Sequence, residues 1–291
     1  MGFAIRSTVP LRYLRSGTDG QPVEINESER PLNDVGMLQE WASSRGELSI
    51  RLLDGVDGLI VENDLMGRFL VDRERSKISM PPAPGVPAPL REAFLWSTPF
   101  AIAGSDVGSV VVHSAAVEVD GRAILLMGDT GAGKTTLSAA FHAAGHRLLS
   151  DDGARCRAED GSVWPGPALL RIRNDMSGRI DRADLEFVHE TPDKTHFAVA
   201  VPRRGGGDAV PISAIVFLHW GPEAANRVEA EMAIARMWPL SFYLPAADGR
   251  RDAFSALGEI ARRVPSYDFS RPRTGGDPSF GVDRLLERCL P

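Results

Sequence analysis

A glycine-rich stretch constrains the fold of this chain more than any other feature of its sequence. Residues 128–136 read G-D-T-G-A-G-K-T-T and match G-x-x-x-x-G-K-[ST], in which glycines let backbone N–H groups turn inward around phosphate oxygens. The apolar run R-A-I-L-L-M precedes the stretch, and residues 135–144 follow with helical spacing of apolar side chains. The sequence therefore predicts a strand, a phosphate-binding loop and a helix whose positive N-terminal end faces an anion.

The pattern gives the loop residues expected roles. Lys134 is expected to reach the β- and γ-phosphates of a nucleotide, and the Thr135 hydroxyl is expected to bind Mg²⁺. The residues expected to bind the nucleotide are Gly128, Asp129, Thr130, Gly131, Ala132, Gly133, Lys134, Thr135 and Thr136.

Two adjacent carboxylates follow the predicted helix. The strand-like run 146–150 leads directly into Asp151 and Asp152. Ligands of α/β sheets lie at the carboxyl ends of the strands, so we expect both carboxylates beside the phosphate. One can hold Mg²⁺, and the other can take a proton from an attacking hydroxyl. The alternative is a plain polar turn, since Asp and Gly are turn residues.

Histidines add weaker signals. His113 lies in the strand-like run 109–119, and the turn residues Asp120 and Gly121 predict a hairpin that places this run beside the strand feeding the loop. There a histidine can tune the pKa of a carboxylate, or it can simply be a core residue. His142 and His146 are four residues apart, but Gly145 interrupts their helix and zinc is not favoured.

Composition narrows the class of protein. The chain has 291 residues, 43% hydrophobic and 25% charged, with a net charge of -6, which argues against a general nucleic-acid binder. No apolar run approaches the roughly 20 residues of a membrane-spanning helix. Cys156 and Cys289 have neither metal-ligand nor disulfide spacing and suit a reducing compartment. We therefore expect a soluble cytoplasmic protein without a membrane or nucleic-acid partner.

The chain divides at a proline-rich segment. Residues 81–89 read P-P-A-P-G-V-P-A-P, which excludes a helix or central strand. Residues 1–88 are expected to form a small mixed α+β region for packing or partner recognition. It would contain strands near 48–53, 58–62 and 67–72 and a short helix at 37–43. Residues 89–291 are expected to form the catalytic domain, opening with a helix over 90–105.

Two further loops carry alternatives. Residues 164–167 read W-P-G-P, and their tryptophan either stacks on a substrate or caps the core. Arg203 and Arg204 precede three glycines. This segment is either a basic loop that closes over a transferring phosphate or a solvated hairpin tip.

The stretch from His113 to Asp152 resembles the C-terminal domain of bacterial HPr kinase/phosphorylase. Both have a histidine-led strand, a turn, a second strand, a phosphate loop, a helix ending in G-H and a strand ending in D-D. The resemblance implies an α/β fold like that of HPr kinase and phosphoenolpyruvate carboxykinase, with a mixed sheet. It also implies an ATP- and Mg²⁺-dependent phosphotransferase acting on a serine or threonine hydroxyl, and a homo-oligomer, since such proteins often assemble.

By position, the resemblance assigns Lys134 to the phosphates and Thr135 and Asp151 to the metal. Asp152 becomes the favoured proton acceptor, and His113 the residue that orients or tunes it. The chain lacks a recognisable form of the family's downstream carboxylate-rich segment, so phosphorylase activity is not expected.

The whole motif order is closer to smaller HPr-kinase-related proteins, among them kinases of lasso-peptide precursors. This branch implies a hydroxyl-bearing peptide or small protein as acceptor, with the segment W-P-G-P-A-L-L-R-I and Lys194 near the nucleotide or acceptor. Two alternatives remain open: a kinase of a small hydroxy compound, and a nucleotide-gated regulator without catalysis.

Overall fold

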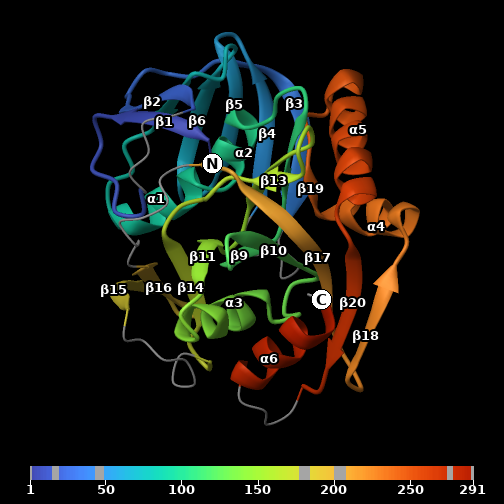
Figure 1. The fold of residues 1–291 in the computed structure, drawn as a ribbon. Helices are drawn as coiled ribbons and strands as arrows, with labels where there is room; N and C mark the ends of the chain where they lie inside the picture. The colour runs from blue at the N-terminus through green and yellow to red at the C-terminus, as the bar shows by residue number, and fades with distance from the viewer. Residues whose placement is uncertain are drawn as a thin grey trace.

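A computed structural model describes residues 2–14, 20–42, 49–176, 184–199, 208–273 and 278–289. Its strands form sheets of seven, ten and three strands, so the fold is a mixed α/β fold, as expected (Figure 1). The helices are α1 (Ala88–Leu95), α2 (Thr98–Ala103), α3 (Lys134–Ala143), α4 (Ala230–Met237), α5 (Ala247–Arg263) and α6 (Pro278–Cys289). In the described part of the chain, no helix is long and apolar enough to cross a membrane.

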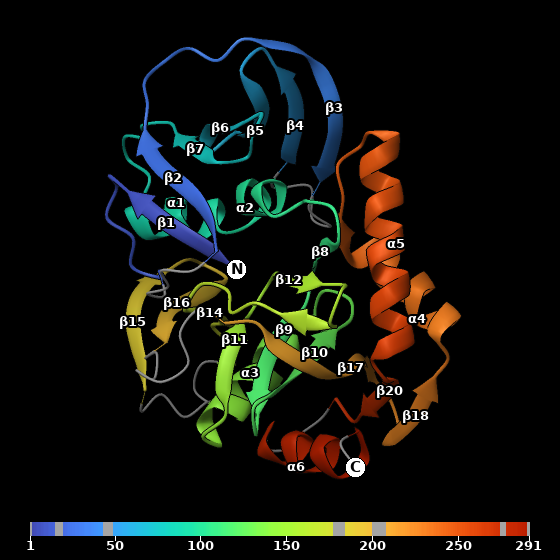
Figure 2. The same cartoon turned by 45° about the horizontal axis from the view of Figure 1, so that its top comes forward.

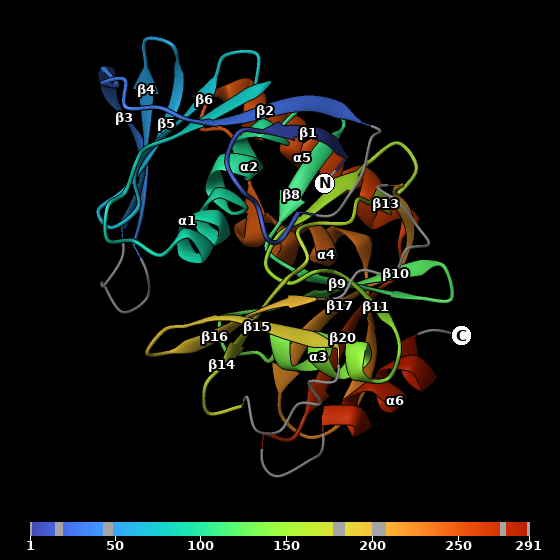
Figure 3. The ribbon, with the colours of Figure 1, turned by 90° about the vertical axis from the view of Figure 1, so that its left-hand side faces the viewer.

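The N-terminal sheet covers two helices. Its strand order is β1-β2-β7-β6-β5-β4-β3, and α1 and α2 pack against one face of it (Figure 3). Alternating side chains of β6, such as Phe69 and Val71, join Leu95 and Phe100 in one buried core. The strands are β1 (Phe3–Ser7), β2 (Gln21–Glu27), β3 (Asp34–Ala42), β4 (Ser49–Gly55), β5 (Gly58–Asn63), β6 (Gly67–Asp72) and β7 (Lys77–Met80).

Two helix predictions need correction here. The helix predicted at 37–43 is wrong, because residues 37–42 belong to β3, which pairs with the backbone of β4 at the sheet edge. Register shifts in this pairing break the period-two pattern that would have marked a strand. The single helix predicted over 90–105 is two helices, since Pro99 lacks an N–H and lies in the first turn of α2.

The ten-stranded sheet positions the phosphate loop. In it β10 is parallel to β17, which is parallel to β20, whereas β9 runs antiparallel between β10 and β11 (Figure 2). The carboxyl ends of β10, β11, β17 and β20 therefore meet at one edge. The strands are β8 (Ser109–Val112), β9 (Ala115–Val119), β10 (Arg122–Met127), β11 (Arg147–Ser150), β12 (Ala154–Arg157), β13 (Ser162–Val163), β17 (Val210–Trp220), β18 (Ala224–Val228), β19 (Ser241–Phe242) and β20 (Ser266–Arg271).

Helices cover both faces of this sheet, which explains why β10 is apolar at successive positions. Leu125 and Met127 face the core that contains α4 and α5. Ile124 and Leu126 face the opposite core, which contains α3 and α6. A strand buried on both faces reads as a continuous apolar run.

A small third sheet lies against α3 and the second of these cores. Its order is β14 (Leu169–Arg173), β16 (Lys194–Val199) and β15 (Leu185–Glu190). Leu170 and Ile172 of β14 belong to the core beneath α3, whereas Leu169 belongs to the core of the N-terminal sheet. Strand β14 therefore connects the two halves of the molecule next to the candidate site.

Candidate active site

The glycine-rich loop follows β10 and precedes α3, in the predicted order. Gly128, Gly131 and Gly133 have φ angles of 142°, 86° and 88°, a region that side chains other than glycine rarely adopt. A Cβ atom at Gly128 would also lie 2.8 Å from the carbonyl oxygen of Leu218. The loop thus needs glycine both for its turn and for its close approach to β17.

Lys134 is a buried cation inside this loop. Its side chain is only 7% exposed, and Nζ donates to the carbonyl oxygens of Gly128 at 2.7 Å and Asp129 at 3.3 Å. Burial lowers the pKa of Lys134, while the nearby Asp152 and Asp151 oppose that change. Both carboxylates thus act electrostatically on the ammonium group.

Asp151 offers a carboxylate oxygen suited to a hard cation. It follows β11, is only 6% exposed, and its Oδ2 accepts a hydrogen bond from the Arg171 backbone N–H at 3.0 Å. Oδ1 is buried without a hydrogen-bond partner among the described residues. Burial raises the pKa of Asp151, the charge of Arg171 counteracts the rise, and the Thr135 side chain lies close enough to oppose it as well. Two oxygen donors, Thr135 Oγ1 and Asp151 Oδ1, thus fit Mg²⁺.

Asp152 is held as a carboxylate. Its side chain forms an ion pair with Arg171, and its Oδ1 lies 3.5 Å from His113 Nδ1. Burial acts to raise the pKa of Asp152, but the charge and hydrogen bond of Arg171 outweigh it and hold the pKa well below its usual range. Asp152 is therefore ionised throughout the neutral pH range.

His113 contacts Asp152 from a break in the predicted strand. Nδ1 lies 3.0 Å from the Asp152 carbonyl oxygen, and burial lowers the pKa of His113. The run 109–119 is not one strand, because β8 pairs with β12 whereas β9 pairs with β10. The hairpin itself is present, with positive φ at Asp120 and Gly121. A neutral imidazole with its proton on Nδ1 would donate to the Asp152 carbonyl.

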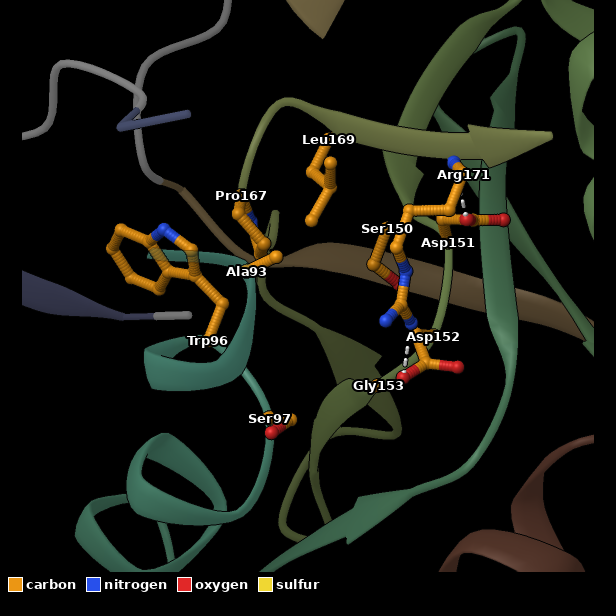
Figure 4. A pocket seen from close by; sticks show the side chains of 10 residues that line it. All are labelled: Ala93, Trp96, Ser97, Ser150, Asp151, Asp152, Gly153, Pro167, Leu169 and Arg171. Carbon is orange, nitrogen blue, oxygen red and sulfur yellow. Dashed lines mark hydrogen bonds and ion pairs between the residues drawn. The ribbon is translucent and has the colours of Figure 1, made fainter. Parts of the chain in front are cut away.

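Arg171 is the site residue that motif analysis missed. It projects from β14 between the two carboxylates, bonding Asp151 through its backbone and Asp152 through its guanidinium (Figure 4). The charge of Asp152 raises the pKa of Arg171. Its only sequence signal was its place in W-P-G-P-A-L-L-R-I. Lys194 begins β16, the neighbouring strand, and desolvation and Arg171 lower its pKa.

A small hollow opens beside Asp152 (Figure 4). One wall comes from α1 and the residue pair after it, and another from the segment leading into β14. The lining residues are Ala93, Trp96, Ser97, Ser150, Asp151, Asp152, Gly153, Pro167, Leu169 and Arg171. Apolar side chains thus flank a charged floor, an arrangement that suits a polar group carried on an apolar stem.

Other predicted residues lie elsewhere. Trp164 stacks against the buried Arg155, whose guanidinium carbon is 4.3 Å from the ring centroid, so it caps the core. Among the described residues, no three His, Cys, Asp or Glu side chains gather as a metal site, and this includes the surroundings of His142 and His146. Arg203 and Arg204 lie outside the described residues.

Comparisons with known proteins agree with the motif order. No family model matches the chain. HPr kinase/phosphorylases from three strains of Streptococcus thermophilus are each 38% identical over 68 residues, or 21% of this chain and 22% of theirs. The chain thus matches about a fifth of the length of these relatives.

A solved structure gives a looser likeness. The Hpr(Ser) kinase/phosphatase from Coxiella burnetii is 11% identical, with a TM-score of 0.31 over 61% of this chain and 93% of that one. This superposition is too loose to support a conclusion. The sequence identity, however, confirms a resemblance to HPr kinase/phosphorylase over part of the length of this chain.

Proposed function

We propose that this chain is a kinase that transfers the γ-phosphate of ATP, with Mg²⁺, to a serine or threonine hydroxyl of a peptide or small protein. The observation that carries the proposal is the buried Oδ1 of Asp151, unpartnered in the described structure, next to Thr135 at the glycine-rich loop. A buried carboxylate oxygen without a hydrogen bond is costly unless a ligand compensates for it.

Each site residue then has a distinct task. Thr135 and Asp151 would hold Mg²⁺, which supplies positive charge at the β- and γ-phosphates when bound. Lys134 and the loop amides bind the phosphate oxygens. His113 fixes the backbone of Asp152, so the carboxylate faces the hollow.

Asp152 accepts the proton of the acceptor hydroxyl. Its low pKa keeps it unprotonated and ready at neutral pH. A weak base suffices, because the hydroxyl proton becomes acidic as its oxygen bonds to phosphorus in a loose transition state.

We infer that the acceptor hydroxyl binds in the hollow beside Asp152. Its apolar walls, Ala93, Trp96 and Leu169, suit the stem of a residue at or near the end of a peptide, such as the terminal serine of a lasso-type precursor. The wall from α1 also favours a second candidate, a small free hydroxy compound. The free, buried Cys156 and Cys289 are in keeping with a cytoplasmic location, where ATP is abundant.

The test is transfer of label from γ-labelled ATP with Mg²⁺ to three acceptors: a peptide ending in serine, a small protein and free serine. We expect label on the peptide or protein. Asp152→Asn should reduce kcat by about 10²–10⁴-fold while leaving the affinity for ADP within about twofold. Asp175→Asn, which changes an exposed carboxylate paired with Arg173, is the matched control.

The possible outcomes distinguish the peptide or protein kinase from its alternatives. Label on free serine alone would favour the small acceptor. ADP binding without any transfer would favour the nucleotide-gated regulator. Full activity in Asp152→Asn would contradict its role as the proton acceptor.

A further inference from the structure

Two side chains contact the phosphate loop from its outer side. Trp220 ends β17 and Arg271 ends β20, and the parallel pairing of these strands places the two residues in register. Both strands end at the same sheet edge as β10, which feeds the loop. Neither residue belongs to the nucleotide-binding motif or to the carboxylate pair.

Together these side chains bind three consecutive loop carbonyls. Trp220 Nε1 donates to the Gly131 oxygen at 2.8 Å. Arg271 Nη2 donates to the oxygens of Ala132 at 3.1 Å and Gly133 at 3.3 Å. The Arg271 guanidinium carbon also lies 4.5 Å from the Trp220 ring centroid, so each side chain fixes the other.

Peptide geometry transmits these contacts to the inside of the loop. In a planar trans peptide the C=O and the following N–H point in opposite directions. Holding the Gly131 carbonyl outward turns the Ala132 N–H toward Asp129, whose oxygen it reaches at 3.0 Å. Holding the Ala132 and Gly133 carbonyls outward turns the N–H groups of Gly133 and Lys134 inward, where phosphate oxygens are expected.

We propose that Trp220 and Arg271 are positioning residues of the phosphate site. Arg271 anchors the carbonyls whose peptide units carry the inward N–H groups of Gly133 and Lys134, and Trp220 holds the preceding turn, in which the Ala132 N–H is bonded to Asp129. The proposal rests on the proposed nucleotide-binding function. Preorganised donors bind an anion more tightly because they need not reorient when it arrives.

Two further observations agree with this role. A Cβ atom at Gly133 would collide with Arg271 Nη2, so the glycine leaves the space that the guanidinium occupies. Burial lowers the pKa of Arg271 to about 10, which still leaves it cationic at neutral pH. Its positive charge behind the loop therefore also favours an anion in front of it.

The experiment compares the affinities of Trp220→Phe and Arg271→Lys for ADP and for inorganic pyrophosphate by calorimetry, without any acceptor. Each lost hydrogen bond should raise Kd by about threefold to tenfold. The factor should be equal for both ligands, because Arg271 anchors amides that face the phosphates and Trp220 holds the turn of the loop that carries them. Arg227→Ala, which removes an arginine stacked 5.1 Å from the Tyr267 ring on the same sheet, should change neither Kd by more than about twofold.

Trp220→Phe keeps the aromatic ring and should leave the thermal midpoint nearly unchanged, so it carries the test if Arg271→Lys loses stability. Weaker binding of ADP with unchanged binding of pyrophosphate would instead indicate a contact with the nucleoside and overturn the proposal. If the wild type binds both ligands tightly and neither variant changes either affinity, the positioning role is overturned and the nucleotide site stands. A wild type that binds neither ligand would overturn the nucleotide site as well.

Discussion

At the scale of single residues, Arg171 sets the charge of Asp152, and this has a consequence for activity. Arg171→Gln removes the guanidinium that lowers the pKa of Asp152. The carboxylate must be ionised to accept a proton, so a raised pKa moves the acid limb of kcat/KM to higher pH. We expect this upward shift of the acid limb in a pH–rate profile of phosphate transfer.

The same strand offers the control. Arg173 lies two residues further along β14, is exposed, and pairs with Asp175 at 3.0 Å rather than with the site carboxylates. Arg173→Gln should leave the acid limb in place. An acid limb that stays unchanged in Arg171→Gln would show that the protonation of Asp152 does not limit the reaction.

Some residues of the site can be predicted from the sequence, and others cannot. The loop glycines, Lys134 and the aspartate pair lie within one short segment whose local pattern predicted their place. Trp220 and Arg271 reach the loop across 89 and 139 residues of sequence. Nothing in a linear pattern reports such pairings, because they depend on strand order in the folded sheet.

At the scale of elements, Glu92 fixes α1 to the N-terminal segment. The carboxylate is 4% exposed and accepts from the backbone N–H groups of Arg12 and Tyr13, each at 2.7 Å, and from Trp96 Nε1 at 3.0 Å. Glu92→Ala leaves these donors unsatisfied and should lower the free energy of unfolding by roughly 2–4 kcal/mol. Denaturant unfolding measured by circular dichroism checks this value.

An exposed glutamate provides the comparison. Glu24 pairs with Lys77 at 3.3 Å on the sheet surface, and Glu24→Ala should cost less than about 1 kcal/mol. Because α1 and the residue after it supply Ala93 and Trp96 to the hollow, Glu92→Ala should also raise KM for the acceptor more than KM for ATP. Equal stability losses in the two variants would contradict the anchoring role of Glu92.

Element boundaries were predictable where local chemistry decides them. The helix after the phosphate loop follows from the periodicity of its apolar residues, and the hairpin follows from the turn residues Asp120 and Gly121. Strand β3 did not, because its conformation comes from pairing with β4 rather than from its own seven-residue pattern.

At the scale of the whole molecule, the cores cross the boundary predicted at residue 88. Helices α1 and α2 follow that boundary, yet they pack in the same core as β1–β7. Leu169 of β14 joins this core as well. The division into residues 1–88 and 89–291 remains a prediction. A proline-rich segment alone does not show whether the helix after it packs against the N-terminal sheet or against the ten-stranded sheet.

The stability of the whole fold should depend on one buried histidine. His196 of β16 is 5% exposed and pairs in register with Arg171 on one side and His189 on the other. Desolvation, then the charges of Arg171, His189 and Lys194, lowers its pKa from 6.5 to about 4. Between these two values the unfolded chain binds the extra proton and the folded chain does not. This histidine therefore makes the protein less stable as pH falls from 6.5 toward 4.

Replacing it should flatten this dependence. At pH 5 the proton linkage of His196 costs up to about 2 kcal/mol relative to pH 7.5, so His196→Gln should lose correspondingly less stability between these pH values. Denaturant unfolding at both pH values measures the difference. Phe197→Leu, a buried neighbour without a titrating group, should lower stability equally at both pH values. A wild-type difference that persists undiminished in His196→Gln would assign the acid sensitivity to other groups.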